Sequence, residues 1–529
     1  MSNSINKSKI IKKRLLIICL ILLCILIIAG IIEKNMGYRI KYRVIASNKT
    51  NSSDLIHNIQ INEMDCAYDS TTNTWYYPED INNQGEELYL KIGIFDSSNT
   101  SISFVMDKEA NRGTYKIDFN NRIRILAYND NSYYETFLQF SGLPIINIQT
   151  NGQEIGDTEI VVNSKIIDPY YNSRNSEQYI ESKANMRLRG GTTRYLPKSP
   201  YKYELIKEDN TTRNKELLGM RNDDDWILDA LYVDPSNIRN VVSCELWNEM
   251  DSYNTTNDYD IDLKFEFVEV FINNKYNGIY VLKEPVDAKT LGINKDEDAL
   301  LIKGNDTIYD YISDGSRIEN YKNTIDIYSR IFEIDYPKDR DNSAMFFQKI
   351  SEYFDVNFEP DLKYLENTFN LNCLIDYNIL VGVCQARDNF GTKNVYYYME
   401  DSDSKIGLIP WDIDMSWGLD YSIYEPNPVT RTTYVFNYEE HDKFPTMYFK
   451  ENADEYNKLV YDRYMELRES VLSYENVESI CNNYRNLLIN SGAYERDNGL
   501  YYSYDLNKEI DDMLNWYKNR VDYLDNYSY

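Results

Sequence analysis

The sequence contains very little histidine. Its 529 residues include only His57 and His441, so a histidine-ligated zinc site or a Ser-His-Asp triad lacks the side chains it needs. Seven cysteines are scattered along the chain without a Cys-x-x-Cys pair, which argues against a zinc site or a disulfide framework. Basic residues are also in deficit, and the net charge of −29 disfavours nucleic acid and anionic lipid as partners. Carboxylates, Asn, Lys and Arg must therefore carry any catalysis.

One long uncharged run lies near the N-terminus, at residues 15–32. Its 18 residues would reach about 27 Å as a helix, close to the thickness of a bilayer core. Five basic residues precede it: Lys7, Lys9, Lys12, Lys13 and Arg14. This pattern predicts a single-pass transmembrane helix, with residues 1–14 in the cytoplasm and the bulk of the chain extracytoplasmic. A cleaved signal peptide is the alternative; we favour a retained anchor because no small-x-small cleavage site follows Ala29.

Residues 33–140 read as β structure. Apolar and polar residues alternate over short segments that are separated by turn-forming clusters rich in Asp, Asn and Ser. The strands are expected at residues 87–95, 101–106, 114–119 and 122–128. This spacing predicts a small β-sandwich of immunoglobulin type. No catalytic constellation is visible there, so a spacer or a binding module is expected.

Residues 141–529 are expected to form a second, larger unit. Its first half is mixed, with strands near residues 143–148, 159–162, 184–188, 201–206, 265–272 and 278–282, and a helix over 236–250. Its second half is helical, at residues 362–382, 455–472, 477–489 and 506–523, apart from one β segment at 394–409. A β-rich half followed by a helical half predicts a two-lobed α+β enzyme.

Four polar residues in the second half have the order that phosphoryl transfer requires. Asp388 lies in a loop after a predicted helix, Asn394 follows six residues later, and Asp412 and Asp414 end a strand. In protein kinases an Asp and an Asn of the catalytic loop and an Asp after the next strands supply the base and the Mg²⁺ ligands. The usual kinase motifs themselves are missing. A solvated or calcium-binding loop is therefore the alternative for these residues.

A second feature supplies the positive charge that this acidic chain otherwise lacks. The strand ending at Arg189 runs into the turn Gly190-Gly191, where backbone amides could approach phosphates. Lys202 lies in the next strand, and Glu245, on a predicted helix, could orient it as in a kinase Lys–Glu pair. Taken singly, an ordinary hairpin turn and an exposed strand lysine explain the same residues.

Many short blocks occur together in one order, and they resemble the CotH-type (spore coat protein H) atypical protein kinases over about residues 143–529. The blocks are Leu143–Ile148, Arg189-Gly190, Pro197–Lys202, Trp226–Leu228, Asp234, Arg239-Asn240, Val268–Asn273, Gly278–Leu282, Glu284, Asp388–Asn394, Pro410–Asp414 and Gly418, with Arg463, Leu467, Arg468, Trp516, Arg520 and Asp525 in the tail.

The resemblance implies an atypical kinase fold that binds ATP with Mg²⁺ or Mn²⁺ and phosphorylates Ser or Thr of proteins, spore coat proteins being the known class. It implies that Asp388 is the catalytic-loop aspartate and that Asp412 is a metal ligand, with Asp414 sharing or replacing that role. Asn394 is the expected further ligand, with Asn389 as the alternative. Residues expected near ATP are Lys202, Lys198, Arg189, Gly190, Glu245 and Glu284, where Glu284 either lies near the base or caps a turn.

The function expected from the sequence is thus a membrane-anchored Ser/Thr kinase of cell-surface or spore-envelope proteins. A non-catalytic binding protein that retains the fold is the alternative, because ATP is scarce outside the cytoplasm. Transfer of phosphate to a cell-wall polymer would use the same residues and stays open.

Overall fold

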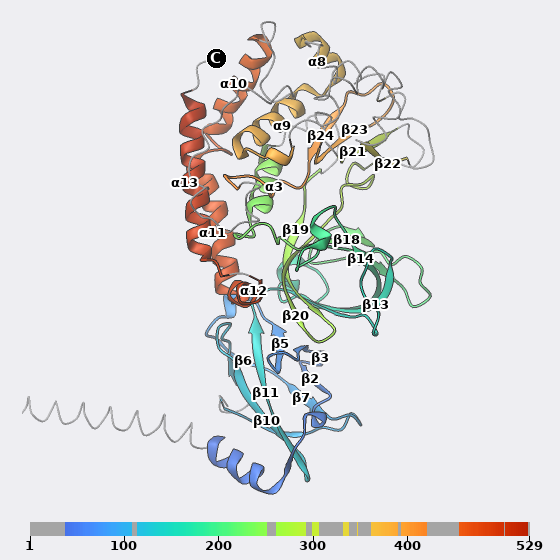
Figure 1. Cartoon of the computed structure of the whole chain (residues 1–529), viewed down its shortest axis with the longest axis vertical. Coiled ribbons are helices and arrows are strands. Elements are labelled where there is room, and N and C mark those ends of the chain that lie inside the picture. Colours follow the sequence, from blue (N-terminus) through green and yellow to red (C-terminus); the bar gives the residue numbers. More distant parts are fainter. Residues whose placement is uncertain are drawn as a thin grey trace, which may run out of the picture.

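The computed structural model describes residues 38–107, 114–250, 261–292, 299–305, 332–337, 346, 361–389, 393–419, 454–501 and 503–526. Three parts follow one another along the long axis of the molecule: an N-terminal β module, a closed barrel, and a helix-rich C-terminal part with its own sheet (Figure 1). The predicted membrane segment, residues 15–32, lies outside the described residues. Within the described ranges, no helix is long and apolar enough to cross a membrane.

The N-terminal module begins with a helix at residues 38–48 and is otherwise made of short strands. Its largest sheet has the order β4-β5-β11-β10-β8, with β1 (Thr50–Asn51) also paired to β11. Smaller sheets are β3-β2-β7 and β6-β9. Strand bounds are β2 Asn58–Ile61, β3 Met64–Asp65, β4 Ala67–Asp69, β5 Thr74–Pro78, β6 Glu87–Tyr89, β7 Ile92–Phe95, β8 Ser103–Met106, β9 Thr114–Lys116, β10 Ile123–Tyr128 and β11 Ser132–Ser141.

Strands appear in each region of this module where alternation predicts them, although the expected strand at 87–95 is divided into β6 and β7. The pairings β5–β11 and β1–β11 are parallel, whereas the sheets of an immunoglobulin domain are typically antiparallel. Aromatic and branched side chains such as Trp75, Phe119 and Phe140 fill the core between the sheets.

The middle part is a seven-stranded closed barrel with the order β12-β13-β14-β15-β18-β20-β19. Its strands are β12 Ile145–Gln149, β13 Ile160–Ile167, β14 Tyr179–Leu188, β15 Tyr201–Ile206, β18 Asp225–Asp229, β19 Phe265–Ile272 and β20 Tyr276–Lys283. A parallel pairing of β12 with β19 closes the ring. Alternation decides which side chains enter it: Tyr203 and Leu205 are in the barrel core, whereas Lys202 points away from it.

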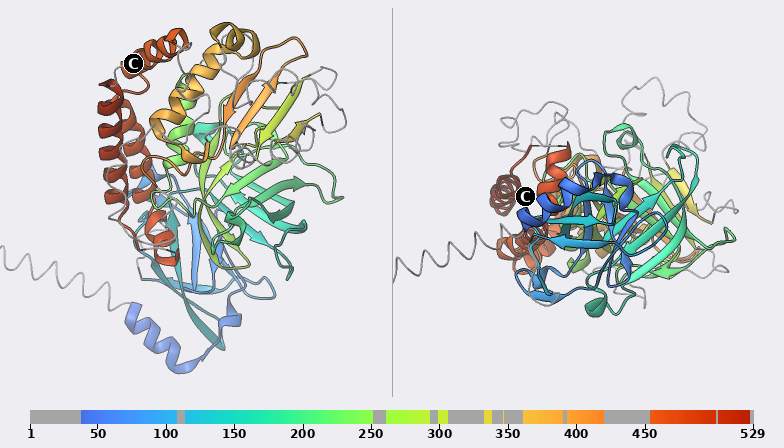
Figure 2. Two further views of the ribbon diagram at one scale, coloured as in Figure 1. Left: turned by 45° about the horizontal axis from the view of Figure 1, so that its top comes forward. Right: turned by 90° about the horizontal axis from the view of Figure 1, so that it is seen from below.

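The C-terminal part combines the sheet β22-β21-β23-β24 with helices. The strands are β21 Leu300–Gly304, β22 Phe332–Tyr336, β23 Val395–Met399 and β24 Gly407–Pro410. The helices are α3 Arg239–Met250, α8 Leu362–Thr368, α9 Leu371–Cys384, α10 Asp454–Arg468, α11 Tyr474–Asn490, α12 Ala493–Tyr501 and α13 Leu506–Asp525. Helices α10, α11 and α13 line one side of the molecule, away from the barrel (Figures 1 and 2). The mixed α+β class expected from the sequence is confirmed.

The helix expected over 362–382 is two helices, α8 and α9. Asn370 separates them, and its side-chain oxygen accepts a hydrogen bond from the Cys373 backbone N–H, which starts a new helix. Helix α9 is buried at twelve of its positions, so it forms the centre of the C-terminal part.

Candidate active site

The candidate site lies where the outer wall of the barrel faces the C-terminal part. Strands β18 and β20 pair with Asp229 opposite Val281, so Asp229 and Lys283 are diagonal neighbours on one face. Ile227 and Val281, which share this face, belong to the core of the C-terminal part. The ends of β18 and β20 therefore place a carboxylate and an ammonium at this boundary between the barrel and the C-terminal part, which is called the junction below.

Lys283 is the central cation of this junction. It is 8% exposed, and its Nζ donates to Asp229 Oδ2 at 2.5 Å and lies 4.4 Å from the Trp411 ring centre. Burial lowers the pKa of Lys283, but the carboxylates of Asp229 and Asp412 outweigh burial and raise it above its ordinary value. Lys283 is therefore held as an ammonium between two acidic groups.

Two further cations lie around Trp411. The guanidinium of Arg189, directly after β14, is 5.4 Å from the Trp411 ring centre. Lys303 of β21 lies over Tyr396, and burial and the neighbouring Arg189 lower its pKa, although Asp335, Glu333 and Asp412 oppose them. A local basic group thus exists within a strongly acidic chain, as a phosphate site requires.

Asp412 and Asp414 follow β24 and form the acidic side of the junction. Asp412 has a φ of +56°, a conformation uncommon for a residue with a Cβ. The intervening Ile413 N–H donates to Asn240 Oδ1 of α3 at 3.0 Å, which fixes the loop to the helix. Burial raises the pKa of Asp412 despite Lys283, and the pKa of Asp414 is raised by burial and then by Asp412. Two carboxylates that repel each other in this way favour a bound cation.

The loop after α9 supplies the remaining polar groups. Asp388 lies in the short 3₁₀ helix η5 (Arg387–Asn389), and Lys393 Nζ contacts it at 2.7 Å while Asn394 Nδ2 lies 3.4 Å away. Asn389 is buried, and its amide donates to the backbone oxygens of Asn394 and Trp411 at 3.0 and 2.6 Å. These two bonds tie the loop to the Asp412 segment. In the described structure the Asn389 Oδ1 atom has no hydrogen-bond partner.

A sequence model of the family described as CotH kinase protein matches residues 186–524, which is more than half of the chain. The chain belongs to this family. The match begins in β14 and ends in α13, so it covers the barrel from β14 onward and the C-terminal part. The matched residues are called the CotH domain below. No curated protein matches the sequence.

Several of the residues singled out from the sequence come together in the CotH domain. Asp388 acts electrostatically on both Asp412 and Asp414, Arg189 acts on Asp412, and Asn394 contacts Asp388. Both Asn394 and its alternative, Asn389, lie on the same short loop, and it is Asn389 whose side-chain oxygen is buried and unpartnered.

Two lysines expected near ATP lie elsewhere in the CotH domain. Lys202 is on the outer side of β15, where Glu159, Glu204 and Asp225 lie within 3.8 Å of its Nζ. Lys198 is fully buried, and its Nζ donates to Asp497 Oδ1 of α12 at 2.8 Å. Lys202 is thus engaged with carboxylates two strands away from Lys283, and Lys198 is engaged with Asp497 of α12.

Of the three other expected ATP contacts, Glu245 and Glu284 have structural partners and Gly190 is exposed. Glu245 of α3 accepts a hydrogen bond from the Tyr484 hydroxyl of α11 at 2.5 Å, and it is not among the partners of Lys202. Glu284 accepts the Arg221 backbone N–H at 2.8 Å. Gly190 is exposed in its turn with a φ of +90°, directly beside Arg189.

Sequence reasoning missed Asp229, Lys283 and Lys303. Lys283 ends the apolar run of β20, and a charged residue at the end of a buried strand is a signal that could have identified it. Asp229 similarly ends the apolar strand β18. Their meeting depends on the pairing of β18 with β20, strands that are distant in sequence and joined only by the barrel topology.

The CotH family implies the use of ATP and a divalent metal in general, and the residues at the junction fit both. Within the described parts of the chain, no group of three or more His, Cys, Asp or Glu side chains is arranged to hold a metal ion. Mg²⁺, however, is usually held by one or two carboxylates together with phosphate oxygens and water. The mutually repelling Asp412 and Asp414 carboxylates and the unpartnered Asn389 oxygen are suitable ligands of this kind.

Proposed function

We propose that this protein is an atypical, two-lobed Ser/Thr protein kinase that transfers the γ-phosphate of ATP with the help of Mg²⁺ or Mn²⁺. The observation that carries the proposal is the junction itself, where Asp388 and Asp412 on one side meet Lys283 and Arg189 on the other. Carboxylates and cations at one place are what phosphoryl transfer needs, because its catalysis consists of positioning and of charge stabilisation.

Each residue has a definite role in this proposal. Lys283 and Arg189 bind phosphate oxygens, while Asp412, Asp414 and an Asn389 or Asn394 amide oxygen hold the cation. When bound, the cation would neutralise the negative charge of the phosphates during transfer. Asp388 accepts the proton of the acceptor hydroxyl as the hydroxyl oxygen bonds to the γ-phosphorus. The bond from that phosphorus to the bridging oxygen breaks, and ADP leaves with the electron pair.

The proposal includes the acceptor and the location. The acceptor is a surface or spore-coat protein, and the hydrophobic run at residues 15–32 anchors the chain with its bulk outside the cytoplasm. Support for this placement comes from the basic residues that precede the run. A non-catalytic platform and a cell-wall acceptor are the competing functions, and the experiment below distinguishes them.

The test is transfer of labelled γ-phosphate from ATP by the detergent-solubilised full chain to a casein-like protein, with a purified wall polymer as a second acceptor. We expect Asp388→Asn and Asp412→Asn to lower incorporation into protein by at least about 100-fold, since each removes a base or a metal ligand. The control is Asp403→Asn, on an exposed turn between β23 and β24, which should retain full activity.

Each other result contradicts part of the proposal. Incorporation that survives both substitutions would reject the site. Incorporation only into the wall polymer would reject the protein acceptor. Wild-type protein that neither transfers phosphate nor is stabilised by millimolar ATP and Mg²⁺ would support the platform instead.

A further inference from the structure

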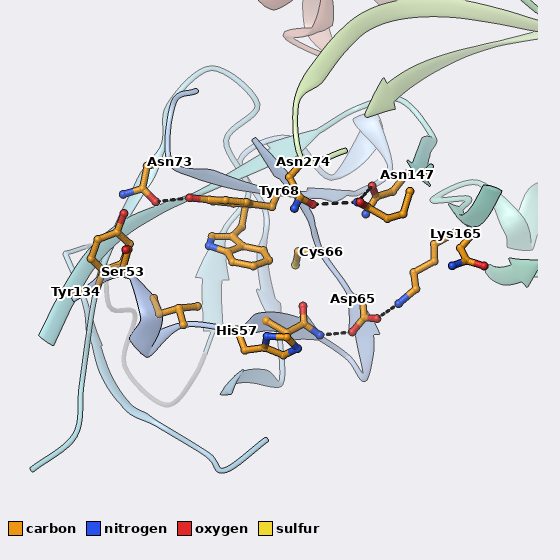
Figure 3. Close-up of a pocket in the computed structure, with 15 residues that line it drawn as sticks. Ser53, His57, Asp65, Cys66, Tyr68, Asn73, Tyr134, Asn147, Lys165 and Asn274 are labelled. Atoms are coloured by element: carbon orange, nitrogen blue, oxygen red, sulfur yellow. Dashed lines mark hydrogen bonds and ion pairs between the residues drawn. The ribbon is translucent and has the colours of Figure 1, made fainter. Parts of the chain in front are cut away.

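A second candidate site lies at the boundary between the N-terminal module and the barrel. It is a cavity of about 490 Å³, here called the junction pocket, and it is separate from the junction at which the candidate active site lies. The module contributes β2 to β5 and β11, while the barrel contributes β12, β13 and the turn after β19 (Figure 3). None of the residues proposed for phosphoryl transfer lines it. Its volume is in the range of pockets that bind small molecules.

Side-chain amides dominate the lining of the junction pocket: Asn58, Asn73, Asn147, Gln149, Asn163 and Asn274. Every amide offers both a donor and an acceptor, which matches a ligand whose groups do both, as hydroxyl groups do. The charged members cancel, because Lys165 forms an ion pair with Asp65. The lining therefore fits an uncharged polar ligand better than an anion or a cation.

Aromatic rings form another wall of the junction pocket. Tyr68 stacks on Trp75 with ring centres 4.5 Å apart and an interplanar angle of 30°. Trp75 is buried beneath it, whereas Tyr68 is only half-buried, and Tyr134 lines the same end (Figure 3). A supported, partly exposed ring offers a flat apolar surface next to hydrogen-bonding groups.

The walls of the junction pocket are held in place before any ligand binds. Gln149 Nε2 donates to Asn274 Oδ1 at 2.9 Å, and the Tyr68 hydroxyl donates to Asn73 Oδ1 at 3.1 Å. The backbone N–H of Ser70 donates to the backbone oxygen of Asn274 at 2.9 Å, which links the module to the barrel. Fixed polar groups of this kind lower the entropic cost of binding.

We propose that the junction pocket binds a neutral pyranose oligosaccharide. The apolar face of a sugar ring fits the Tyr68 surface, and its hydroxyl groups match the amides of the barrel wall, Asn147, Gln149, Asn163 and Asn274. A peptide is the less suitable occupant, because peptides commonly add a strand to a free sheet edge. Of the lining strands only β3 and β4 end their sheets, so such a peptide would pair with the module and not with the barrel wall, which carries four of the six amides. Strands β12 and β13 of this wall are paired on both sides within the closed barrel.

The test is calorimetric titration of the detergent-solubilised full chain with triacetylchitotriose and, separately, cellotriose. We expect at least one of them to bind at millimolar concentration or below. Tyr68→Ala should weaken that binding by at least about fivefold, and Asn147→Ala by about two- to tenfold, through loss of the ring surface and of a hydrogen-bonding amide.

The matched control is Tyr89→Ala, a tyrosine of the same module that is 72% exposed and outside the pocket. It should bind the sugar as the wild type does. Circular dichroism of each variant checks its fold, and Asn163→Ala, at an exposed rim position, provides a second probe should Tyr68→Ala unfold. Failure of both sugars to bind, or equal binding by the wild type and the Asn147→Ala and Asn163→Ala variants, would overturn the proposal.

Discussion

Lys202 and Lys283 lie on neighbouring parts of the barrel wall in opposite surroundings. Lys202 is about one quarter exposed and lies near three carboxylates on the outer face. Lys283 is buried against Trp411, and the carboxylates of Asp229 and Asp412 both attract its ammonium group. Only Lys283 therefore has acidic groups beside it that also belong to the proposed site.

We predict that Lys283→Met weakens binding of ATP with Mg²⁺ by about 10- to 100-fold, because a charge-assisted contact to phosphate is lost. The measurement is the dissociation constant from a thermal-shift titration. Lys202→Met is the matched control, and its constant should change by less than about twofold. Equal losses in the two variants would contradict the assignment of Lys283.

A single carboxylate of the barrel wall, Glu266 in β19, makes stability depend on pH. Burial raises its pKa from 4.5 to about 7; Arg174 opposes this, but Arg174 also pairs with Asp168. Between these values the folded protein holds a proton that the unfolded chain has released. The contribution of Glu266 to the free energy of unfolding should therefore fall as pH rises from about 4.5 to about 7.

Glu266→Gln should remove this component of the pH dependence. We expect the variant to gain stability relative to the wild type when both are moved from pH about 5 to pH about 8. Urea unfolding curves at the two pH values measure the difference. If the two proteins have parallel pH profiles, Glu266 does not titrate in this range.

At the scale of elements, helix α12 is attached to the barrel by buried ion pairs, and Lys198–Asp497 is one of them. Lys198 Nζ and Asp497 Oδ1 are 2.8 Å apart with both side chains almost fully buried, and the same oxygen accepts the Ile279 N–H. Gly278 has a φ of +97°, and a Cβ there would come within 2.0 Å of Asp497. The contact between helix and barrel thus needs both this glycine and this ion pair.

Asp497→Asn should lower the free energy of unfolding by about 3 kcal/mol, because it leaves the Lys198 ammonium buried without a counter-charge. Burial already lowers the pKa of Lys198, although Asp497 opposes this, so the loss should shrink at high pH. Denaturant unfolding measures both effects. In the exposed pair Lys508–Asp512, Asp512→Asn serves as the control and should cost about 0.5 kcal/mol or less.

The sequence patterns predicted individual helices and strands better than the contacts between them. Alternation and apolar stripes located α3, β15 and α13, because these signals are local. Asp388 and Asp412 could be singled out because their order along the chain is itself informative. Lys283 could not be, since its position beside Asp229 depends on the pairing of β18 with β20. Lys202 lies on the same outer face as Lys283 but two strands away, beside carboxylates of its own. Helix α12 was missed altogether.

At the scale of the whole molecule, Glu269 joins all three parts. This fully buried carboxylate of β19 accepts two hydrogen bonds of 2.9 Å from Arg496 of α12 and one from the Ser141 hydroxyl at the end of the module. Tyr76 of the module also packs on Phe271 and Tyr276 of the barrel. Polar and apolar contacts together should make the module, barrel and helices a cooperative unit.

We therefore predict one thermal unfolding transition for the described parts in differential scanning calorimetry. Arg496→Met leaves Glu269 without its counter-charge and should lower the midpoint of that whole transition. A substitution on the exposed module surface, Tyr89→Ala, should leave it unchanged. A separate transition for the module, unaffected by Arg496→Met, would show that the parts are independent.

The indole ring of Trp411 has a practical consequence. Lys283 and Arg189 lie 4.4 and 5.4 Å from its centre, and Tyr396 meets it edge-on at 5.6 Å. The emission of an indole responds to charges held against its face, so any ligand that draws these two cations away alters its colour and intensity. The chain thus contains an optical reporter of its own site, and the difference spectrum against Trp411→Phe isolates that signal from the other five tryptophans.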